Sequence, residues 1–295
     1  MKIKLSKNGA VCEVDSMGGE IVSYRTASGL SCLWEGDPDV WAGHSPHLFP
    51  IIGTLPQGRH WLNGRWYEMG KHGFLRGTEF SVQERTSDSI VLLRRDNESS
   101  FDQYPFSFSF FVTHTLLQNG LETSYRVINH SKSAMPFCVG GHPAFSCPVF
   151  EDEVFSDYEL QLPDGVASAV LCAESDDPLA GSKNLRLPIR NNSLPLSHDY
   201  LKDNVLIFEN TGCQQVTLHS KKHSYAAQLS FQGFANFAIW TFGSKQAKYL
   251  CIEPWQGLPC MKTDGISLTD KPYCIQLKPG CQREFVYRIR FFETQ

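Results

Sequence analysis

The sequence predicts an all-β protein with minor helix, built as a sandwich or a barrel. Apolar and polar residues alternate with the two-residue period of a strand in most apolar segments. Turn residues separate these segments at intervals of roughly 8–12 residues, which favours a sandwich or barrel over a sheet with crossover helices. Of the 295 residues, 41% are hydrophobic and 12% are aromatic, so the chain holds enough apolar material for a large core.

The first half of the chain contains two hairpin signals. The N-terminal segment at 1–15 is typical of a strand and lacks the apolar centre of a signal peptide. An Asn-Gly pair at 63–64 predicts a tight turn across which Trp61 and Trp66 pair. A second Asn-Gly pair, at 119–120, lies between two segments that alternate strictly, and it predicts a longer hairpin with a phenylalanine stripe facing the core.

The second half continues in the same style after one different region. Residues 150–200 are rich in Asp, Ser, Pro and Asn, which predicts a loop-heavy excursion that docks on a sheet rather than a linker between domains. We therefore expect a single domain over residues 1–295. β-Branched and aromatic runs then predict strands at 205–208, 215–219, 225–231, 237–242, 249–252 and 284–292.

Charge and cysteine usage exclude several classes of function. The formal net charge is 27 minus 31, or −4, with no basic stripe, so a nucleic-acid partner is not expected. No segment is apolar enough to span a membrane, and a cytoplasmic location is expected. The ten cysteines include no Cys-x-x-Cys spacing, so we expect reduced thiols that are buried as small hydrophobic groups.

The segment Gly140-Gly141-His142-Pro143-Ala144-Phe145 is the first candidate for chemistry. Its glycines permit a close approach of backbone to ligand, and the proline restricts His142 to an extended backbone. A histidine fixed in this way is a candidate general acid or base. The alternative is a tight turn whose histidine binds a backbone carbonyl.

The second candidate is the run YLCIEPWQG at 249–257. A hydrophobic strand there leads into Glu253, followed by a proline and Trp255. A carboxylate beside an aromatic ring suits a sugar site, because the acid handles hydroxyl protons and the ring offers a face to C–H groups. Cys251 precedes Glu253 by two residues and shares its face in a regular strand. The alternative is a charged residue at an exposed strand end.

The third candidate is the run KHGFLR at 71–76. His72 precedes a glycine that lets a ligand approach the backbone, and Arg76 supplies a planar set of donors. Upstream, HLFPIIG at 47–53 is bracketed by a proline and predicts an edge strand or a packed loop. Alone, His72 is equally explained as a satisfied loop histidine.

Together, HLFPIIG, KHGFLR, GGHPAF and CIEPWQG closely resemble, in this order, motifs of the aldose 1-epimerase (mutarotase) family, in particular its bacterial, galactose mutarotase-like branch. The resemblance runs from about residue 1 to about residue 290. It implies a β-supersandwich of large antiparallel sheets with a sugar cleft, and monosaccharide anomers as substrates of an isomerase. It also implies no metal and no cofactor.

The resemblance assigns roles by motif. Glu253 matches the family's catalytic base, His142 its catalytic acid and His72 a second catalytic imidazole. Asp203 is the nearest counterpart of an aspartate that holds sugar hydroxyls, and we expect Arg76 and Trp255 to bind substrate as well. Where the family commonly has an arginine before the first hairpin, this chain has Thr54. Either Arg76 or Arg59 substitutes for it, or the sugar hydroxyl that the arginine would bind is recognised differently.

The predicted division of labour needs an ionised Glu253 and a protonated His142 near neutral pH, because a carboxylate raises the pKa of a neighbouring histidine. Activity is then expected to fall on both the acid and the alkaline side. The monosaccharide is a hexose, free or phosphorylated, and the protein is a monomer or homodimer.

Three other functions fit parts of the sequence. A non-catalytic carbohydrate-binding protein could use the same fold, since fold alone does not define function. A metal enzyme could use His44 and His47 as ligands, although a surface turn explains that spacing better. A glycosidase needs two carboxylates beside the scissile bond, and only Glu253 lies in a convincing setting.

Overall fold

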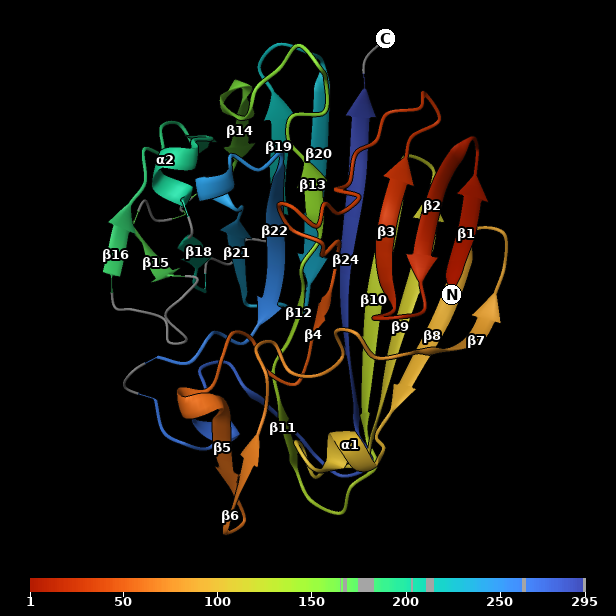
Figure 1. Ribbon diagram of the computed structural model, residues 1–295, viewed down its shortest axis with the longest axis vertical. Helices are drawn as coiled ribbons and strands as arrows, with labels where there is room; N and C mark the ends of the chain where they lie inside the picture. The colour runs from red at the N-terminus through yellow and green to blue at the C-terminus, as the bar shows by residue number, and fades with distance from the viewer. Residues whose placement is uncertain are drawn as a thin grey trace.

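The computed structural model describes residues 1–164, 166, 169–174, 183–202, 204–210, 215–261 and 264–293. Within them, the larger sheet is formed by the strands β7 Ser81–Arg85, β8 Ser89–Arg95, β9 Phe108–Leu117, β10 Gly120–Asn129, β14 Tyr158–Gln161, β17 Ser193–Pro195, β19 Gln215–Ser220, β20 Tyr225–Gln232 and β24 Gln282–Glu293. Their order across the sheet is β17-β14-β19-β20-β24-β10-β9-β8-β7, and all neighbours are antiparallel (Figure 1).

The second large sheet carries the sequence motifs. Its strands are β4 His47–Leu48, β12 Val139–Gly141, β13 Ala144–Ser146, β15 Ala169–Glu174, β16 Lys183–Arg186, β18 Asn204–Phe208, β21 Asn236–Trp240 and β22 Tyr249–Gln256. The order is β16-β15-β18-β21-β22-β12-β4, and β13 pairs with the start of β22. β22 is therefore a central strand, and β4 is an edge strand as its sequence predicts.

Smaller elements complete the described fold. They are the sheet β1 Lys2–Lys7, β2 Ala10–Asp15 and β3 Glu20–Arg25, the pairs β5 Arg59–Leu62 with β6 Arg65–Glu68 and β11 Met135–Phe137 with β23 Ile275–Leu277, the helices α1 Glu98–Phe101 and α2 His198–Leu201, and the 3-10 segments Pro56–Gly58, Phe155–Asp157, Gly243–Lys245 and Leu268–Asp270. None of the described helices is long and apolar enough to cross a membrane. The all-β prediction with minor helix is confirmed.

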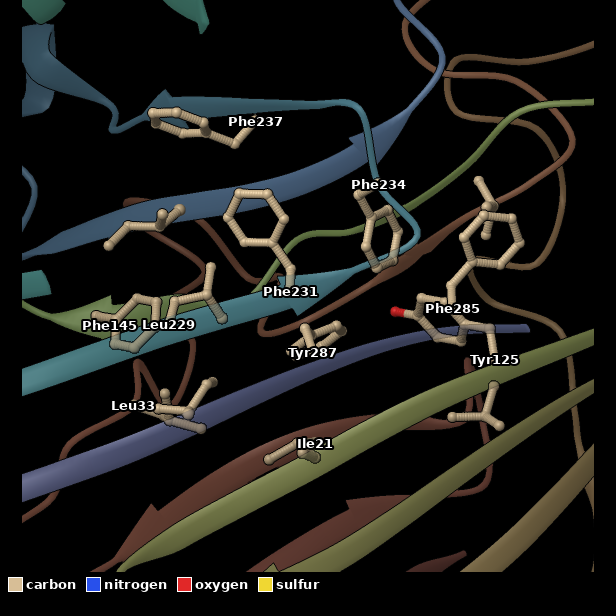
Figure 2. Close-up of a cluster of buried hydrophobic side chains, with 14 of the residues drawn as sticks. Ile21, Leu33, Tyr125, Phe145, Leu229, Phe231, Phe234, Phe237, Phe285 and Tyr287 are labelled. Carbon is tan, nitrogen blue, oxygen red and sulfur yellow. The ribbon is translucent and has the colours of Figure 1, made fainter. Parts of the chain in front are cut away.

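The core lies between the two large sheets. Phe231 on β20 and Phe237 on β21 face each other with ring centroids 6.1 Å apart (Figure 2). Leu250 and Ile252 of β22 point into the same hydrophobic cluster. Because side chains alternate along a strand, the residues between them face the opposite side of the sheet.

Both predicted Asn-Gly hairpins are confirmed. β9 and β10 pair from Leu117 opposite Gly120, and Trp61 lies opposite Trp66 with ring centroids 5.2 Å apart. Two predicted strand ends are wrong: β21 stops at Trp240, whereas β22 continues past its proline to Gln256. The expectation that the cysteines are buried is wrong for Cys281, which is exposed.

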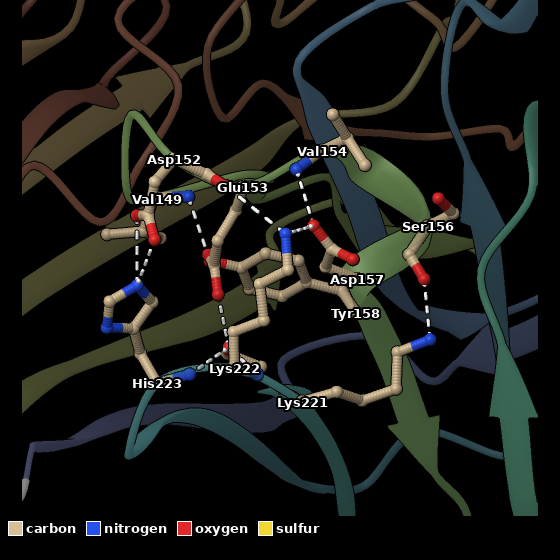
Figure 3. Close-up of polar contacts among 11 residues, drawn as sticks. Val149, Asp152, Glu153, Val154, Ser156, Asp157, Tyr158, Lys221, Lys222 and His223 are labelled. Carbon is tan, nitrogen blue, oxygen red and sulfur yellow. Dashed lines mark hydrogen bonds and ion pairs between the residues drawn. The ribbon is translucent and has the colours of Figure 1, made fainter.

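The region 150–200 docks on the sheets, as expected, and contributes β14 and β17 to the larger sheet and β15 and β16 to the second one. Glu153 is buried and accepts hydrogen bonds from the hydroxyls of Tyr158 and Ser220 (Figure 3). Lys222 binds Asp157 at 2.7 Å in the same network. The described part of this region has more strand than a loop-heavy segment predicts, since β14 to β17 lie in it. The single domain over 1–295 stays a prediction.

Candidate active site

The centre of the site is the side of β22 that faces away from the core. Cys251, Glu253 and Trp255 lie on this side, and every residue from Tyr249 to Trp255 is buried. Burial of a carboxylate in the middle of a central strand is costly unless it has partners. Glu253 has two partners: one comes from a distant segment of the chain, and the other lies two residues further along the same strand.

The first partner is His142, which the register of the sheet places opposite Glu253. β12 pairs with the end of β22 and β13 pairs with its start in one common register, and His142 lies in the gap between β12 and β13. Pro143 and Pro254 have no N–H to donate, so the ladder is interrupted here without a change of register. His142 Nε2 lies 3.2 Å from Glu253 Oε1.

The second partner is Trp255, whose Nε1–H donates to Glu253 Oε2 over 3.2 Å. The ring is 2% exposed and packs against Gly140, where a β-carbon would lie 2.7 Å from Cδ1 of the indole. Trp255 therefore holds the carboxylate through its N–H group. The aromatic face that the sequence suggested for a sugar is covered by protein, so sugar contact by Trp255 stays a prediction.

Burial controls the protonation of the pair. Glu253 is 1% exposed and His142 is 8% exposed. Desolvation raises the pKa of Glu253 well above its usual value. Desolvation, with a smaller contribution from Arg76, lowers the pKa of His142 to about 3. Both directions oppose the expected imidazolium and carboxylate pair, because burial removes the hydration that each charged form needs.

Neutral His142 and protonated Glu253 carry one proton between them. The ion pair would carry the same number, so the two states differ only by movement of one proton along the 3.2 Å contact. In the described part of the chain, Nδ1 of His142 is buried without a hydrogen-bond partner.

The third predicted imidazole, His72, is held by a strained loop. Its backbone has a φ of 65°, which is unusual for a residue with a side chain. Two hydrogen bonds with Gly53 hold it: the His72 N–H donates to the Gly53 carbonyl over 2.7 Å, and the Gly53 N–H donates to His72 Nδ1 over 3.1 Å. With Nδ1 as acceptor, the neutral ring carries its proton on Nε2.

His72 is brought beside His142, at 6.0 Å between ring centroids and 87° between ring planes. Burial lowers the pKa of His72 well below its ordinary value, and the neighbouring His142 lowers it further. His72 is therefore a neutral hydrogen-bond donor at the edge of the acid–base pair. Backbone strain at such a position is typical of functional sites.

Two aromatic residues that sequence reasoning missed lie against His142. The rings of Trp41 and Trp240 are 5.4 Å and 5.8 Å from the imidazole between centroids, and both are partly exposed. Trp240 could have been found from strand alternation, because it lies opposite Cys251 on β21. Trp41 lies in a loop of no clear pattern, and only tertiary structure brings it here.

Two basic side chains from the segment 71–76 act electrostatically on the Glu253 and His142 pair. Arg76 and Lys71 are exposed, and their charges favour the ionised form of Glu253 and disfavour that of His142. Arg59 packs instead over the ring of Trp66 at 4.4 Å and donates to Gln57. Of the two arginines proposed to compensate for Thr54, only Arg76 acts on the pair. Asp203 lies outside the described residues, so its role stays a prediction.

Among the described residues, one set of three donors could meet a metal ion. The ligand atoms of His142, Cys251 and Glu253 all lie within 4.8 Å of one another, which confirms that Cys251 reaches this face. The His44 and His47 pair does not form a site. His44 Nε2 contacts the Glu35 carbonyl, and both nitrogens of His47 are engaged inside the protein.

An all-β supersandwich with a buried histidine and glutamate facing each other on its second sheet defines a galactose mutarotase-like protein. The solved structure of a galactose mutarotase related enzyme from Lactobacillus acidophilus superposes with a TM-score of 0.92 at 29% identity, covering 100% of this chain and 98% of the other. A galactose mutarotase-like protein from Lactobacillus casei gives 0.92 at 27%, covering 99% and 100%.

The sequence comparison agrees. The model of the aldose 1-epimerase family matches residues 1–290, and the chain belongs to this family. The LacX protein of Lactococcus lactis subsp. lactis is 29% identical over 290 residues, which is 95% of either chain.

Proposed function

We propose that this protein is an aldose 1-epimerase that interconverts the α and β anomers of a hexose, with Glu253 and His142 as its acid–base pair. The observation that carries the proposal is the contact of Glu253 with His142, both buried and 3.2 Å apart on adjacent segments of one sheet. Ring opening of a sugar hemiacetal needs one group that accepts a proton and one that donates a proton.

The two protonation states of the Glu253 and His142 pair correspond to the states before and after ring opening. In the ion-pair form, Glu253 takes the proton of the C1 hydroxyl while His142 gives its proton to the ring oxygen. The C1–O5 bond breaks, C1 becomes an aldehyde carbon, and the pair is left as protonated Glu253 and neutral His142. Burial favours this second tautomer, so one proton transfer within the pair has to form the ion pair before the ring opens.

Ring closure reverses the proton movements after rotation about the C1–C2 bond. His142 accepts the proton of the O5 hydroxyl, and Glu253 returns a proton to the carbonyl oxygen on the other face. No proton is gained or lost over the cycle. His72 supplies a neutral N–H donor to an oxygen at the reacting end, and Asp203 and Arg76 are the proposed ligands of the other hydroxyls.

The substrate is proposed to be a hexose, because the family acts on aldoses. The exposed cations Lys71 and Arg76 are the observation that keeps a phosphorylated hexose as a second candidate. A carbohydrate-binding protein without catalysis would not need a proton donor and acceptor facing each other, and the contact of His142 with Glu253 argues against it.

Polarimetry of freshly dissolved sugars tests the proposal. We expect faster decay of optical rotation with the protein than without it, for α-D-glucose, α-D-galactose or the 6-phosphate of either sugar, in proportion to protein concentration. The preferred sugar identifies the substrate. Binding of a sugar without acceleration for any of the four would favour the carbohydrate-binding protein.

The chain contains a matched control for the active pair. His219 and Glu159 also lie opposite each other on adjacent strands, with Nε2 and Oε1 3.2 Å apart, but in a more exposed setting. Glu253→Gln should lower the rate by about 10²–10⁴-fold, the range for loss of a general acid or base. Glu159→Gln should leave it unchanged.

A further inference from the structure

Two cysteines that are distant in sequence meet at the end of a short ladder. β11 and β23 are antiparallel, with Phe137 opposite Ile275. The ladder ends there, and continuing its register by one step places Cys138 opposite Cys274. Their backbone N–H groups bond elsewhere, to the carbonyls of Pro50 and Lys271.

This position corresponds to a non-hydrogen-bonded cross-strand pair, the closer of the two antiparallel types, in which Cα atoms are typically about 4.5 Å apart. A disulfide spans Cα separations of about 4.4–6.8 Å. Cys274 packs against the hydrophobic cluster that contains Cys138, and its thiol donates to the Ile275 carbonyl over 3.6 Å. Oxidation of this pair needs no large movement of the backbone.

The surroundings of the pair supply a positive charge and one route to solvent. Lys271 is 3% exposed, and its Nζ donates to the thiol of Cys260 over 2.8 Å. The neighbouring Cys274 thiol and the positive charge of Lys271 lower the pKa of the Cys138 thiol, although burial opposes this shift. Cys274 is half-buried and links the pair to solvent. Other thiols behave oppositely: burial raises the pKa of Cys147 well above its usual value.

We propose that Cys138 and Cys274 form a reversible oxidation site for a small peroxide. The thiolate of one cysteine of the pair attacks one oxygen of hydrogen peroxide, so that an S–O bond forms, the O–O bond breaks and the departing hydroxide takes a proton to become water. The sulfur of the other cysteine then attacks the sulfenic acid sulfur. An S–S bond forms, the S–O bond breaks, and the second hydroxide leaves as water with the thiol proton. Two thiols and one peroxide give one disulfide and two waters.

The disulfide would restrain the ends of β12 and β22, the strands of the second large sheet that flank the candidate site. Cys138 lies directly before β12 and packs against Gly257, where a β-carbon would come within 2.5 Å of its sulfur. Gly257 follows β22, the strand that carries Glu253. The new bond would tie β23 to these two strands and close a long loop, which stabilises a fold chiefly by restricting its unfolded chain.

Mass spectrometry of the intact protein after treatment with hydrogen peroxide tests the proposal. We expect a loss of about 2 Da, a cross-linked peptide containing Cys138 and Cys274, and a melting temperature raised by about 5 °C that returns to its original value with dithiothreitol. Cys274→Ser and Cys138→Ser should each abolish the 2 Da loss.

Cys147→Ser is the matched control, since it removes a buried thiol away from the pair and should leave the cross-link intact. A cross-link through Cys260, or gains of 16 or 32 Da without a disulfide, would overturn the proposal. None of these readouts depends on mutarotase activity, so this inference and the proposed function stand or fail separately.

Discussion

At the scale of single residues, the site depends on a carboxylate and an imidazole that share one proton. Burial favours neutral Glu253 and neutral His142, whereas attraction between them favours the ion pair, and the two forms differ by one proton transfer over 3.2 Å. A pair of this kind titrates as a unit. It also has both groups ready for ring opening without an external acid or base.

The pH dependence follows from these directions. On the acid side the pair gains a second proton only near the His142 pKa of about 3, so kcat/KM should stay nearly constant between pH 7 and pH 4.5. On the alkaline side the pair loses its only proton as pH rises through the raised Glu253 pKa, and activity should fall. Polarimetric rates corrected for spontaneous mutarotation measure this. A tenfold loss between pH 7 and pH 5.5 would contradict it.

Trp255 is a positioning residue for Glu253, and the second prediction concerns its N–H group. Trp255→Phe removes the hydrogen bond to Oε2, which lowers the Glu253 pKa in the native protein. We expect kcat/KM to fall about tenfold or more, as for loss of a hydrogen bond to a charged group, and the alkaline limb to move to higher pH. If Trp255 had only a structural role, the alkaline limb of the pH profile would keep its position in Trp255→Phe. Trp66→Phe, in the exposed hairpin, is the matched control.

At the scale of elements, the loop that carries His72 depends on a close approach of two backbones. Gly73 has a φ of 79°, and a β-carbon there would lie 2.0 Å from the carbonyl oxygen of Phe49. The same segment holds His72 through Gly53. This fixes the imidazole beside the acid–base pair although its residues lie about seventy positions before His142 in the chain.

Substitutions at two glycines of this loop distinguish the stability cost of a positive φ from the cost of the close approach of two backbones. Gly77 has a φ of 73° but open space around it, so Gly77→Ala should cost only about 1 kcal/mol of unfolding free energy from the left-handed backbone. Gly73→Ala must also displace the Phe49 backbone, and we expect a loss of about 3 kcal/mol or more together with reduced activity. Urea unfolding measures both, and equal losses would contradict the account.

At the scale of the whole molecule, the sequence was sufficient for the fold class and the two hairpins. It also singled out His142 and Glu253, which the structure places in contact, while their catalytic roles stay a prediction. The two residues were identifiable because glycine and proline mark their backbone, and because strand alternation places Cys251 and Glu253 on one face. The protonation of the pair could not be predicted, since it depends on burial by distant segments. Trp41 was missed for the same reason. The hydrogen bond from Trp255 to Glu253 could not be predicted either, because it depends on the direction in which the indole side chain points.

Buried histidines also link the stability of the whole fold to pH. His47 and His114 both contact the carbonyl of Gly19 through Nε2 at 2.8 Å, and burial lowers their pKa values to about 3 and about 4. The unfolded chain binds these protons below about pH 6.5, whereas the folded chain does not. The unfolding free energy should therefore fall with falling pH, by ~1.4 kcal/mol per pH unit for each histidine.

Urea unfolding between pH 7 and pH 4.5 measures this slope. His47→Gln should reduce it by the contribution of one histidine, whatever its effect on stability at pH 7. A slope unaffected by His47→Gln would show that His47 is not held neutral by the fold.

The most direct test of the central claim is a double-mutant cycle on mutarotation rates, with His142→Asn, Glu253→Gln and the double variant. If the two groups act as one proton-sharing unit, each single variant loses about 10²–10⁴-fold and the double variant is about as slow as the slower single variant. Losses that multiply in the double variant, or single variants that keep the wild-type rate, would contradict the account.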